Sequence, residues 1–206
     1  MLLAALLLLA ASSDRPRLPP VDQCSAAPHF MAFRKQLAEV IARKDVTGLL
    51  ELADEKIQLS FGGDSGRRAM RRIWSLDKPA TSKLWAKLSE VLRLGCAVTE
   101  QGIAVAPSMF ETLPESADAF ETVVAVKAAI LRAAPDEKAR PIEMLSWDLL
   151  TAREGIDETG DWTKVALKDG RTGFVRSSAL RSPIDYRATF ERKAGQWRMT
   201  AFVAGD

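Results

Sequence analysis

Few side chains in this sequence have both the type and the spacing that catalysis requires. Gly63-Asp64-Ser65-Gly66 presents a serine in a glycine-rich turn, and such a serine attacks substrates only beside a histidine base and an orienting carboxylate. The single histidine, His29, opens a predicted helix in a different segment. We therefore interpret the turn as a strand-to-helix connection, and we predict a non-enzymatic protein with no catalytic residue and no cofactor.

The two cysteines, Cys24 and Cys96, have a second possible chemistry. Together with one histidine they cannot fill the four positions of a structural zinc site, so we predict no metal site. In an exported protein they could form one disulfide. Alternatively, Cys96 is a small buried apolar residue and Cys24 lies in a loose N-terminal segment. Both alternatives stay open, because sequence alone does not give the separation of the two residues.

Basic residues follow the glycine-rich turn at the start of a predicted helix. Backbone N–H groups at a helix N-terminus attract anions, which makes Arg67 and Arg68 candidate anion-binding residues. The alternative is an ordinary solvated helix face.

Aromatic residues provide the candidate ligand contacts. Trp147 interrupts an apolar alternation where a loop is expected, which favours an exposed aromatic contact. Trp162 and Phe174 lie on two predicted strands, and each is a candidate either for ligand binding or for the core. Trp74, Trp85 and Trp197 match the periodicity of their elements and are expected in the core.

The composition and the N-terminal segment limit the classes of protein to which the chain can belong. An apolar content of 47% with 27% charged residues is typical of a soluble globular protein, and a net charge of +2 does not favour a nucleic-acid partner. The apolar run that begins at Leu2 is too short to span a bilayer, which takes about 20 residues. It suits a signal peptide over residues 1–13, followed by a proline-containing linker over 14–28. We therefore expect a periplasmic or secreted protein, with no stable membrane insertion of the mature chain.

The N-terminal half has mainly helical periodicity. The spacing predicts a helix from Phe30 to Ile41, a short helix capped by Asp45, a helix over 67–74, and a long helix capped by Thr81 or Ser82 and ended by Gly95. Alternating apolar residues predict a strand over 57–61, and residues 103–107 favour an edge strand. These elements indicate an α+β domain over 29–120, with three helices and a small antiparallel sheet.

Residues 121–181 read as an all-β module. Asp169-Gly170 between two apolar runs predicts a hairpin with a type I′ turn. A further hairpin follows over 186–203, with a turn at 193–195 and with Trp197, Met199, Ala201 and Val203 on one face. A lone hairpin is marginal in water, so we expect residues 182–206 to return and complete the first domain. The β module is then an insertion before the closing hairpin.

Short motifs in this module resemble the bacterial SH3-like domain. They are Ala129–Pro135, Gly160-Asp161-Trp162-Thr163-Lys164-Val165, and Gly170-Arg171-Thr172-Gly173-Phe174-Val175. The resemblance implies a small barrel that binds peptides or cell-wall material. The flanking parts are similar to the nuclear-transport-factor-like (SnoaL-like) α+β cone, through Leu49–Ala53 and Gly195-Gln196-Trp197.

The expected function is binding in the bacterial cell envelope, of a protein or peptide or of peptidoglycan, through the SH3-like module. The alternative is a small-molecule-binding or enzymatic cone domain with the SH3-like module as an accessory. A cone enzyme would present polar side chains from several strands into one pocket. The chain offers few such residues outside its predicted loops, which favours the binding function.

Overall fold

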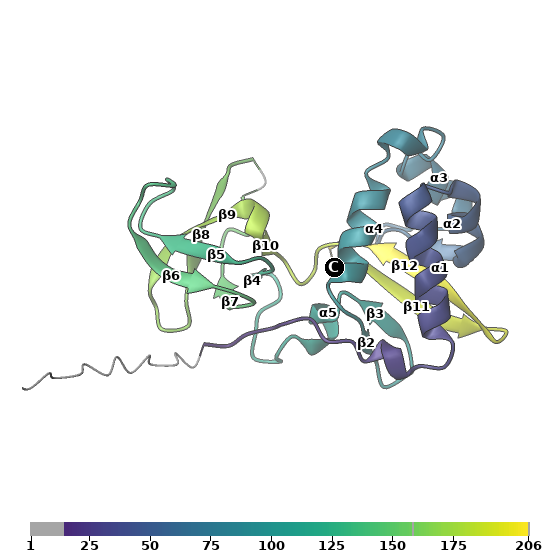
Figure 1. The fold of residues 1–206 in the computed structure, drawn as a ribbon, viewed down its shortest axis with the longest axis horizontal. Helices are drawn as coiled ribbons and strands as arrows, with labels where there is room; N and C mark the ends of the chain where they lie inside the picture. The colour runs from purple at the N-terminus through teal and green to yellow at the C-terminus, as the bar shows by residue number, and fades with distance from the viewer. Residues whose placement is uncertain (1–14, 158, 206) are drawn as a thin grey trace, which may run out of the picture.

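The computed structural model describes residues 15–157 and 159–205, so the signal peptide expected over residues 1–13 lies outside the described residues. The described chain forms two lobes that lie side by side (Figure 1). The first lobe packs helices against a five-stranded sheet, and the second is built on a seven-stranded sheet. The predicted α+β class is confirmed at this level.

The helices and strands have the following bounds. The α-helices are α1 (Phe30–Arg43), α2 (Val46–Leu52), α3 (Arg67–Ile73), α4 (Leu84–Arg93) and α5 (Met109–Thr112). The strands of the first lobe are β1 (Ala53–Gln58), β2 (Ala97–Val98), β3 (Ala104–Ala106), β11 (Arg187–Lys193) and β12 (Gln196–Val203). Those of the second are β4 (Thr122–Ala125), β5 (Ala129–Arg132), β6 (Pro141–Leu145), β7 (Leu149–Thr151), β8 (Trp162–Ala166), β9 (Thr172–Arg176) and β10 (Leu180–Arg181).

In the described residues, four α-helices precede β2, one for each of the four segments with predicted helical spacing, so the expected total of three helices was too low. None of these elements, nor α5, combines the length and the apolar composition that a bilayer span requires.

The first sheet has the strand order β1-β12-β11-β3-β2. The closing hairpin therefore lies at its centre, although the other strands all precede the second lobe in the sequence. β12 runs parallel to β1, and the remaining pairs are antiparallel. The sheet is thus mixed, and the predicted purely antiparallel sheet was wrong. β1 and β12 are far apart in sequence, and only strands joined by a tight turn are obliged to run antiparallel.

The prediction of an edge strand over 103–107 was also wrong. β3 lies between β11 and β2, and all three of its residues are buried, as befits an interior strand. The edge is formed instead by β2, which the sequence analysis missed because a strand of two residues has no periodicity to detect.

The core of the first lobe fills the space between its helices and its sheet. Phe30 of α1 meets Phe190 edge-on at 5.6 Å and Trp197 at 4.9 Å, measured between ring centroids. Trp85 and Trp197 are buried, as predicted, whereas Trp74 is only partly buried. Edge-to-face contacts of this kind add to the free energy gained from burial of the rings.

Capping residues set the helix ends in the first lobe. The carboxylate of Asp45 accepts a hydrogen bond of 3.0 Å from the Gly48 N–H and begins α2, as predicted. The Ser82 hydroxyl accepts one of 3.3 Å from the Leu84 N–H at the start of α4. Gly95 follows the end of α4 with φ +84°, a conformation that glycine adopts without strain.

The strand predicted over 57–61 is displaced toward the N-terminus. β1 begins at Ala53, where α2 has just ended and pairing with β12 starts. Beyond Gln58 the chain folds back on itself, since the Leu59 N–H donates to the Asp64 carbonyl and the Gly66 N–H to the Ile57 carbonyl. Phe61 consequently lies at the tip of a turn and is 51% exposed.

The second sheet has the strand order β10-β4-β7-β8-β9-β5-β6. No pairing joins its first and last strands in the described residues, so the sheet is not closed into the barrel that we predicted. β10 has only two residues, and its pairing is with β4. A separate apolar core, which includes Leu131, Val165 and Val175, packs against the inner face of this sheet.

The turn of the β8–β9 hairpin differs in type from the one expected. In the β8–β9 hairpin, Leu167 and Arg171 are joined by a backbone hydrogen bond, and only Gly170 of the intervening residues has a positive φ. This is the pattern of a three-residue turn with a bulge, and the predicted type I′ turn was wrong. The β11–β12 hairpin instead has a two-residue turn at Ala194 and Gly195, both with positive φ.

A β-bulge changes which side chains of β12 face the core. Phe190 pairs with Met199, but the preceding residue of β11, Thr189, pairs with Ala201, so Thr200 is an extra residue. Trp197 and Met199 face the core on the expected side of β12, and after the bulge the next side chain to face this core is Phe202. The expected continuation of that face through Ala201 and Val203 was therefore wrong.

The segment predicted as a linker over 14–28 packs on both lobes in its described part. The Leu149 N–H donates to the Pro16 carbonyl and the Leu18 N–H donates to the Trp147 carbonyl, both in the second lobe. Further along, Cys24 forms a disulfide with Cys96 of the first lobe. We refer to residues 15–24 as the strap.

A third apolar cluster joins the lobes beneath the strap. It combines Leu18 of the strap with Leu94 and Met109 of the first lobe and Val124 and Val126 of the second. Because these side chains are buried against one another, the two lobes share packed apolar surface in addition to their covalent connections.

Candidate ligand-binding groove

The outer face of the β8–β9 hairpin carries two cross-strand pairs of side chains, and we refer to these four side chains as the grid. Trp162 lies directly opposite Arg176, and Lys164 lies directly opposite Phe174. The alternate residues Thr163, Val165, Gly173 and Val175 face inward and are buried. The strict period of two in a strand thus places two aromatic and two cationic side chains on one outer face.

These outer side chains form one wall of a groove of about 900 Å³. Trp162, Lys164 and Phe174 line this wall, and both aromatic side chains are partly exposed. The other wall is the loop after β7, over residues 153–157. The volume lies in the range of ligand-binding clefts, which is about 300–1,000 Å³.

The two cations of the grid differ in their partners. The Arg176 guanidinium lies over the Trp162 ring, 4.4 Å from its centroid. It also pairs with Glu137 at 2.8 Å and Asp161 at 2.7 Å, and these hydrogen bonds raise its pKa. In the described residues the Lys164 side chain is exposed and forms neither a hydrogen bond nor an ion pair.

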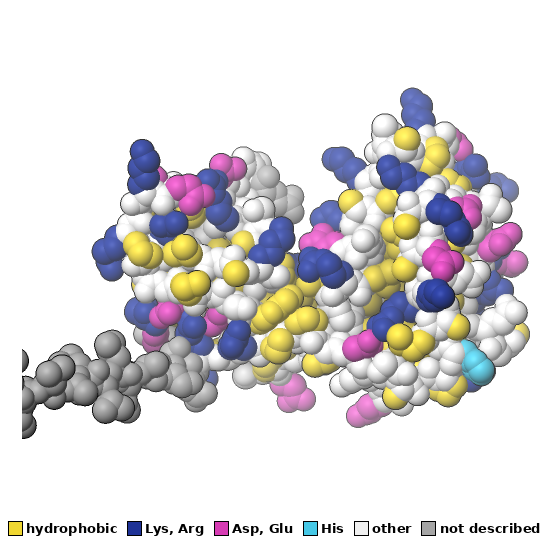
Figure 2. Space-filling view, in the orientation of Figure 1, with side chains coloured by type: hydrophobic (Ala, Val, Ile, Leu, Met, Phe, Trp, Pro, Cys, Tyr) yellow, Lys and Arg dark blue, Asp and Glu magenta, His cyan; other side chains and the backbone are white. Residues whose placement is uncertain are grey.

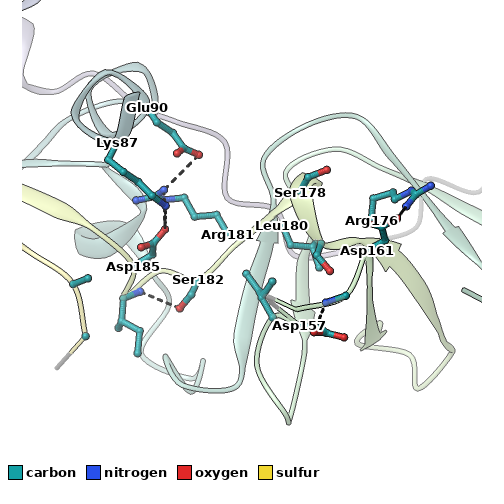
Figure 3. A pocket seen from close by; sticks show the side chains of 16 residues that line it. Lys87, Glu90, Asp157, Asp161, Arg176, Ser178, Leu180, Arg181, Ser182 and Asp185 are labelled. Atoms are coloured by element: carbon teal, nitrogen blue, oxygen red, sulfur yellow. Dashed lines mark hydrogen bonds and ion pairs between the residues drawn. The ribbon is translucent and has the colours of Figure 1, made fainter. Parts of the chain in front are cut away.

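A second hollow, of about 830 Å³, lies between the lobes (Figure 3). An ion-pair network at one end of it joins Arg181 of β10 to α4 of the first lobe: Arg181 contacts Asp185 at 3.1 Å and Glu90 at 3.5 Å, and Lys87 contacts Asp185 at 3.8 Å. On the opposite side Arg176 pairs with Asp161. Since these charges are already paired with one another, this interlobe cleft offers a ligand fewer free charged groups than the groove does.

The structure brings together only two of the three aromatic candidates. Trp162 and Phe174 share the groove, whereas Trp147 packs against the apolar cluster between the lobes and is partly buried. Trp147 has a left-handed backbone with φ +62°. Its N–H donates to the Ala125 carbonyl, and its own carbonyl accepts from the Leu18 N–H of the strap. Its place in the structure is thus at the junction of the lobes.

The two candidate anion-binding residues, Arg67 and Arg68, differ in their surroundings. The Arg67 guanidinium donates two hydrogen bonds to the Ala53 carbonyl, at 3.0 and 2.6 Å, and so ties α3 to the start of β1. Arg68 is exposed on the same short helix. Arg67 therefore has a structural role that its position at the start of the predicted helix did not indicate.

The interior of the first lobe is occupied by its own side chains. Phe30, Phe190 and Phe202 are fully buried between the helices and the sheet. Within residues 15–157 and 159–205, no three His, Cys, Asp or Glu side chains lie together in an arrangement suited to a metal ion. Ser65, which forms an isolated β-bridge with Gln58, and His29, in the turn before α1, are both exposed and lie in separate segments.

Sequence reasoning missed two parts of the groove. Lys164 could have been found, because it alternates with Trp162 on a strand whose neighbours Thr163 and Val165 face inward. The loop wall at 153–157 could not, because its position over β8 follows from the tertiary fold. Figure 2 shows how hydrophobic and basic side chains lie next to one another on the visible face of the second lobe.

The chain matches no protein-family model, and a search of curated proteins finds no match either.

Proposed function

We propose that this is an exported, non-enzymatic binding protein of the bacterial cell envelope, which recognises a protein or peptide, or peptidoglycan, through an SH3-like second lobe. The observation that carries the proposal is the groove itself. It places Trp162 and Phe174, both partly exposed, on one wall of a cleft large enough for a ligand. Half-exposed aromatic side chains in a cleft are typical of ligand contacts, because they bury a large apolar area on binding.

We assign the recognition to side chains of the groove. β8 and β9 are interior strands, with β7 and β5 as their outer neighbours, although β8 pairs with β7 at one position, Ala166 with Thr151. The partly exposed rings of Trp162 and Phe174 offer large apolar areas for burial, so we propose that they provide most of the binding energy.

Two substitutions test the proposal. Trp162→Ala and Phe174→Ala should each weaken binding to the ligand by about tenfold or more, as expected for truncation of an interfacial aromatic anchor. The probes are a displayed library of short random peptides and purified peptidoglycan, each applied to the full chain. Far-ultraviolet circular dichroism checks that the variants keep their fold.

Met144→Ala is the matched control. Met144 is a large apolar side chain on β6 of the same sheet, it is 71% exposed, and it does not line the groove. The proposal predicts that this variant binds like the wild type. Retention of the wild type on neither probe, or equal binding by all three variants, would contradict it.

A further inference from the structure

We propose that the groove takes an extended acidic peptide segment of a protein partner, and that Lys164 is the residue that contacts its carboxylate. This inference rests on the proposed function and specifies the chemistry of the ligand. Lys164 lies between Trp162 and Ala166 on the outer face of β8, directly opposite Phe174. Lys164 is therefore a direct neighbour of both aromatic residues of the grid, of Trp162 along the strand and of Phe174 across it.

The charged side chains that line the groove are Arg153, Glu154 and Asp157 on the loop wall and Lys164 on the strand wall. The Asp157 carboxylate accepts hydrogen bonds of 2.7–2.9 Å from Thr159 and Gly160, which lower its pKa and keep it anionic within its own loop. In the part of the chain that the structure describes, Lys164 has no such partner. A ligand carboxylate would supply the missing charge.

The spacing of the grid suits an extended peptide. Side chains on one face of a strand repeat about every 6.6 Å, and those of a bound extended peptide repeat at the same distance. A peptide that lies along β8 can thus place an apolar side chain at Trp162 and, two residues further on, a carboxylate at Lys164, with Phe174 of the neighbouring strand beside it. The complementarity is between two aromatic side chains beside one lysine and a peptide with an acidic side chain beside apolar ones.

The same geometry favours a peptide over a glycan. A sugar ring binds an aromatic residue by stacking on its face, and the Arg176 guanidinium already covers one face of the Trp162 indole. Arg176 is held there by Glu137 and Asp161, so this cover is built into the sheet surface. The groove therefore offers the partly exposed aromatic side chains beside the unpaired cation of Lys164. Apolar and acidic amino-acid side chains can contact these groups.

A charge reversal tests the inference. The full wild-type chain and the variants Lys164→Gln and Lys164→Glu are used to select from a displayed library of short random peptides. The wild type should enrich peptides with Asp or Glu beside apolar residues. Lys164→Gln should bind those peptides about tenfold more weakly, and Lys164→Glu should shift the enrichment from acidic to basic residues. Lys168→Glu is the control, since Lys168 is exposed on the same hairpin but does not line the groove.

The outcomes separate this inference from the proposed function. If Lys164→Glu and Lys168→Glu select the same peptides as the wild type, while Trp162→Ala still abolishes binding, the acidic-peptide inference is overturned and the proposed function stands. If purified muropeptides bind at the groove and random peptides do not, the ligand is peptidoglycan and the inference is again overturned. If Trp162→Ala binds all probes like the wild type, both proposals fail.

Discussion

Lys164 and Arg181 show how the neighbours of a charged side chain decide what it can do. Arg181 is buried between the lobes and pairs with Asp185 and Glu90, so its charge is engaged within the protein. Lys164 is exposed in the groove and has no partner in the described ranges. A lysine side chain that has no partner within the protein keeps its charge and its rotamer freedom, and both are available when a ligand binds.

A carboxylate of the first lobe provides a prediction for pH dependence. The Lys56 N–H donates to Asp54 at 2.9 Å and the Lys193 ammonium lies 3.1 Å from it, and together they lower the pKa of Asp54. A carboxylate whose pKa is lower in the folded state stabilises the fold above its unfolded pKa, and this contribution disappears as pH falls through the folded pKa.

Asp54→Asn should therefore lower the free energy of unfolding at neutral pH by about 0.5 kcal/mol, and by less below about pH 4. Urea unfolding across this range measures the difference. Lys193→Gln should reproduce only part of the effect, because the Lys56 hydrogen bond remains. A difference between Asp54→Asn and wild type that does not shrink at low pH would contradict this account.

At the scale of the elements, the β8–β9 hairpin shows that the type of a turn depends on local hydrogen bonds as well as on the two residues that mark the turn in the sequence. Asp169-Gly170 is a strong marker of a type I′ turn, yet the hydrogen bond between Leu167 and Arg171 selects a three-residue turn. The Asp169 carboxylate supports this choice by accepting hydrogen bonds from the backbone and side chain of Arg171. Gly170 alone then needs the left-handed conformation.

Gly170→Ala should lower the free energy of unfolding by about 1–2 kcal/mol through backbone strain, since a Cβ at this position would meet no other atom. Gly62→Ala is the matched control, because Gly62 lies in an exposed turn without a positive φ and has room for a Cβ. Thermal unfolding of both variants measures the contrast. Equal midpoints for the two would contradict the assigned turn.

Periodicity predicted most of the elements, and contacts distant in sequence decided the rest. The stripe from Phe30 to Ile41 predicts α1, and Asp45 predicts the start of α2, because both signals lie within the element itself. The bulge at Thr200 has no such signal, since it arises where β12 is paired with β11. For the same reason Trp162 and Phe174 could be identified from alternation, while the loop wall opposite them could not.

At the scale of the whole molecule, the strap holds both lobes in one arrangement. It contacts Trp147 of the second lobe through Leu18 and is fixed to the first lobe by the Cys24–Cys96 disulfide. The Arg15 guanidinium adds an ion pair of 3.2 Å to the buried carboxylate of Asp148. These contacts keep the groove-bearing lobe packed on the first.

Replacement of both cysteines by alanine should lower the free energy of unfolding by about 2–4 kcal/mol, because the disulfide closes a loop with a sequence separation of 72 residues. Urea unfolding of the oxidised wild type and the double variant measures this loss. Wild type unfolded in the presence of a thiol reductant is the control and should resemble the variant. Coincident unfolding curves for oxidised wild type and the variant would show that the disulfide adds no stability.

The central claim is that the outer face of β8 and β9 binds the ligand. Nuclear magnetic resonance of the isotopically labelled full chain, titrated with a peptide selected from the random library, tests it most directly. We predict that the largest shifts fall on the Trp162 indole N–H and on the amides of Lys164 and Phe174, with small changes in the interlobe cleft. The largest shifts at Arg181 and Asp185, or none at the groove, would contradict the claim.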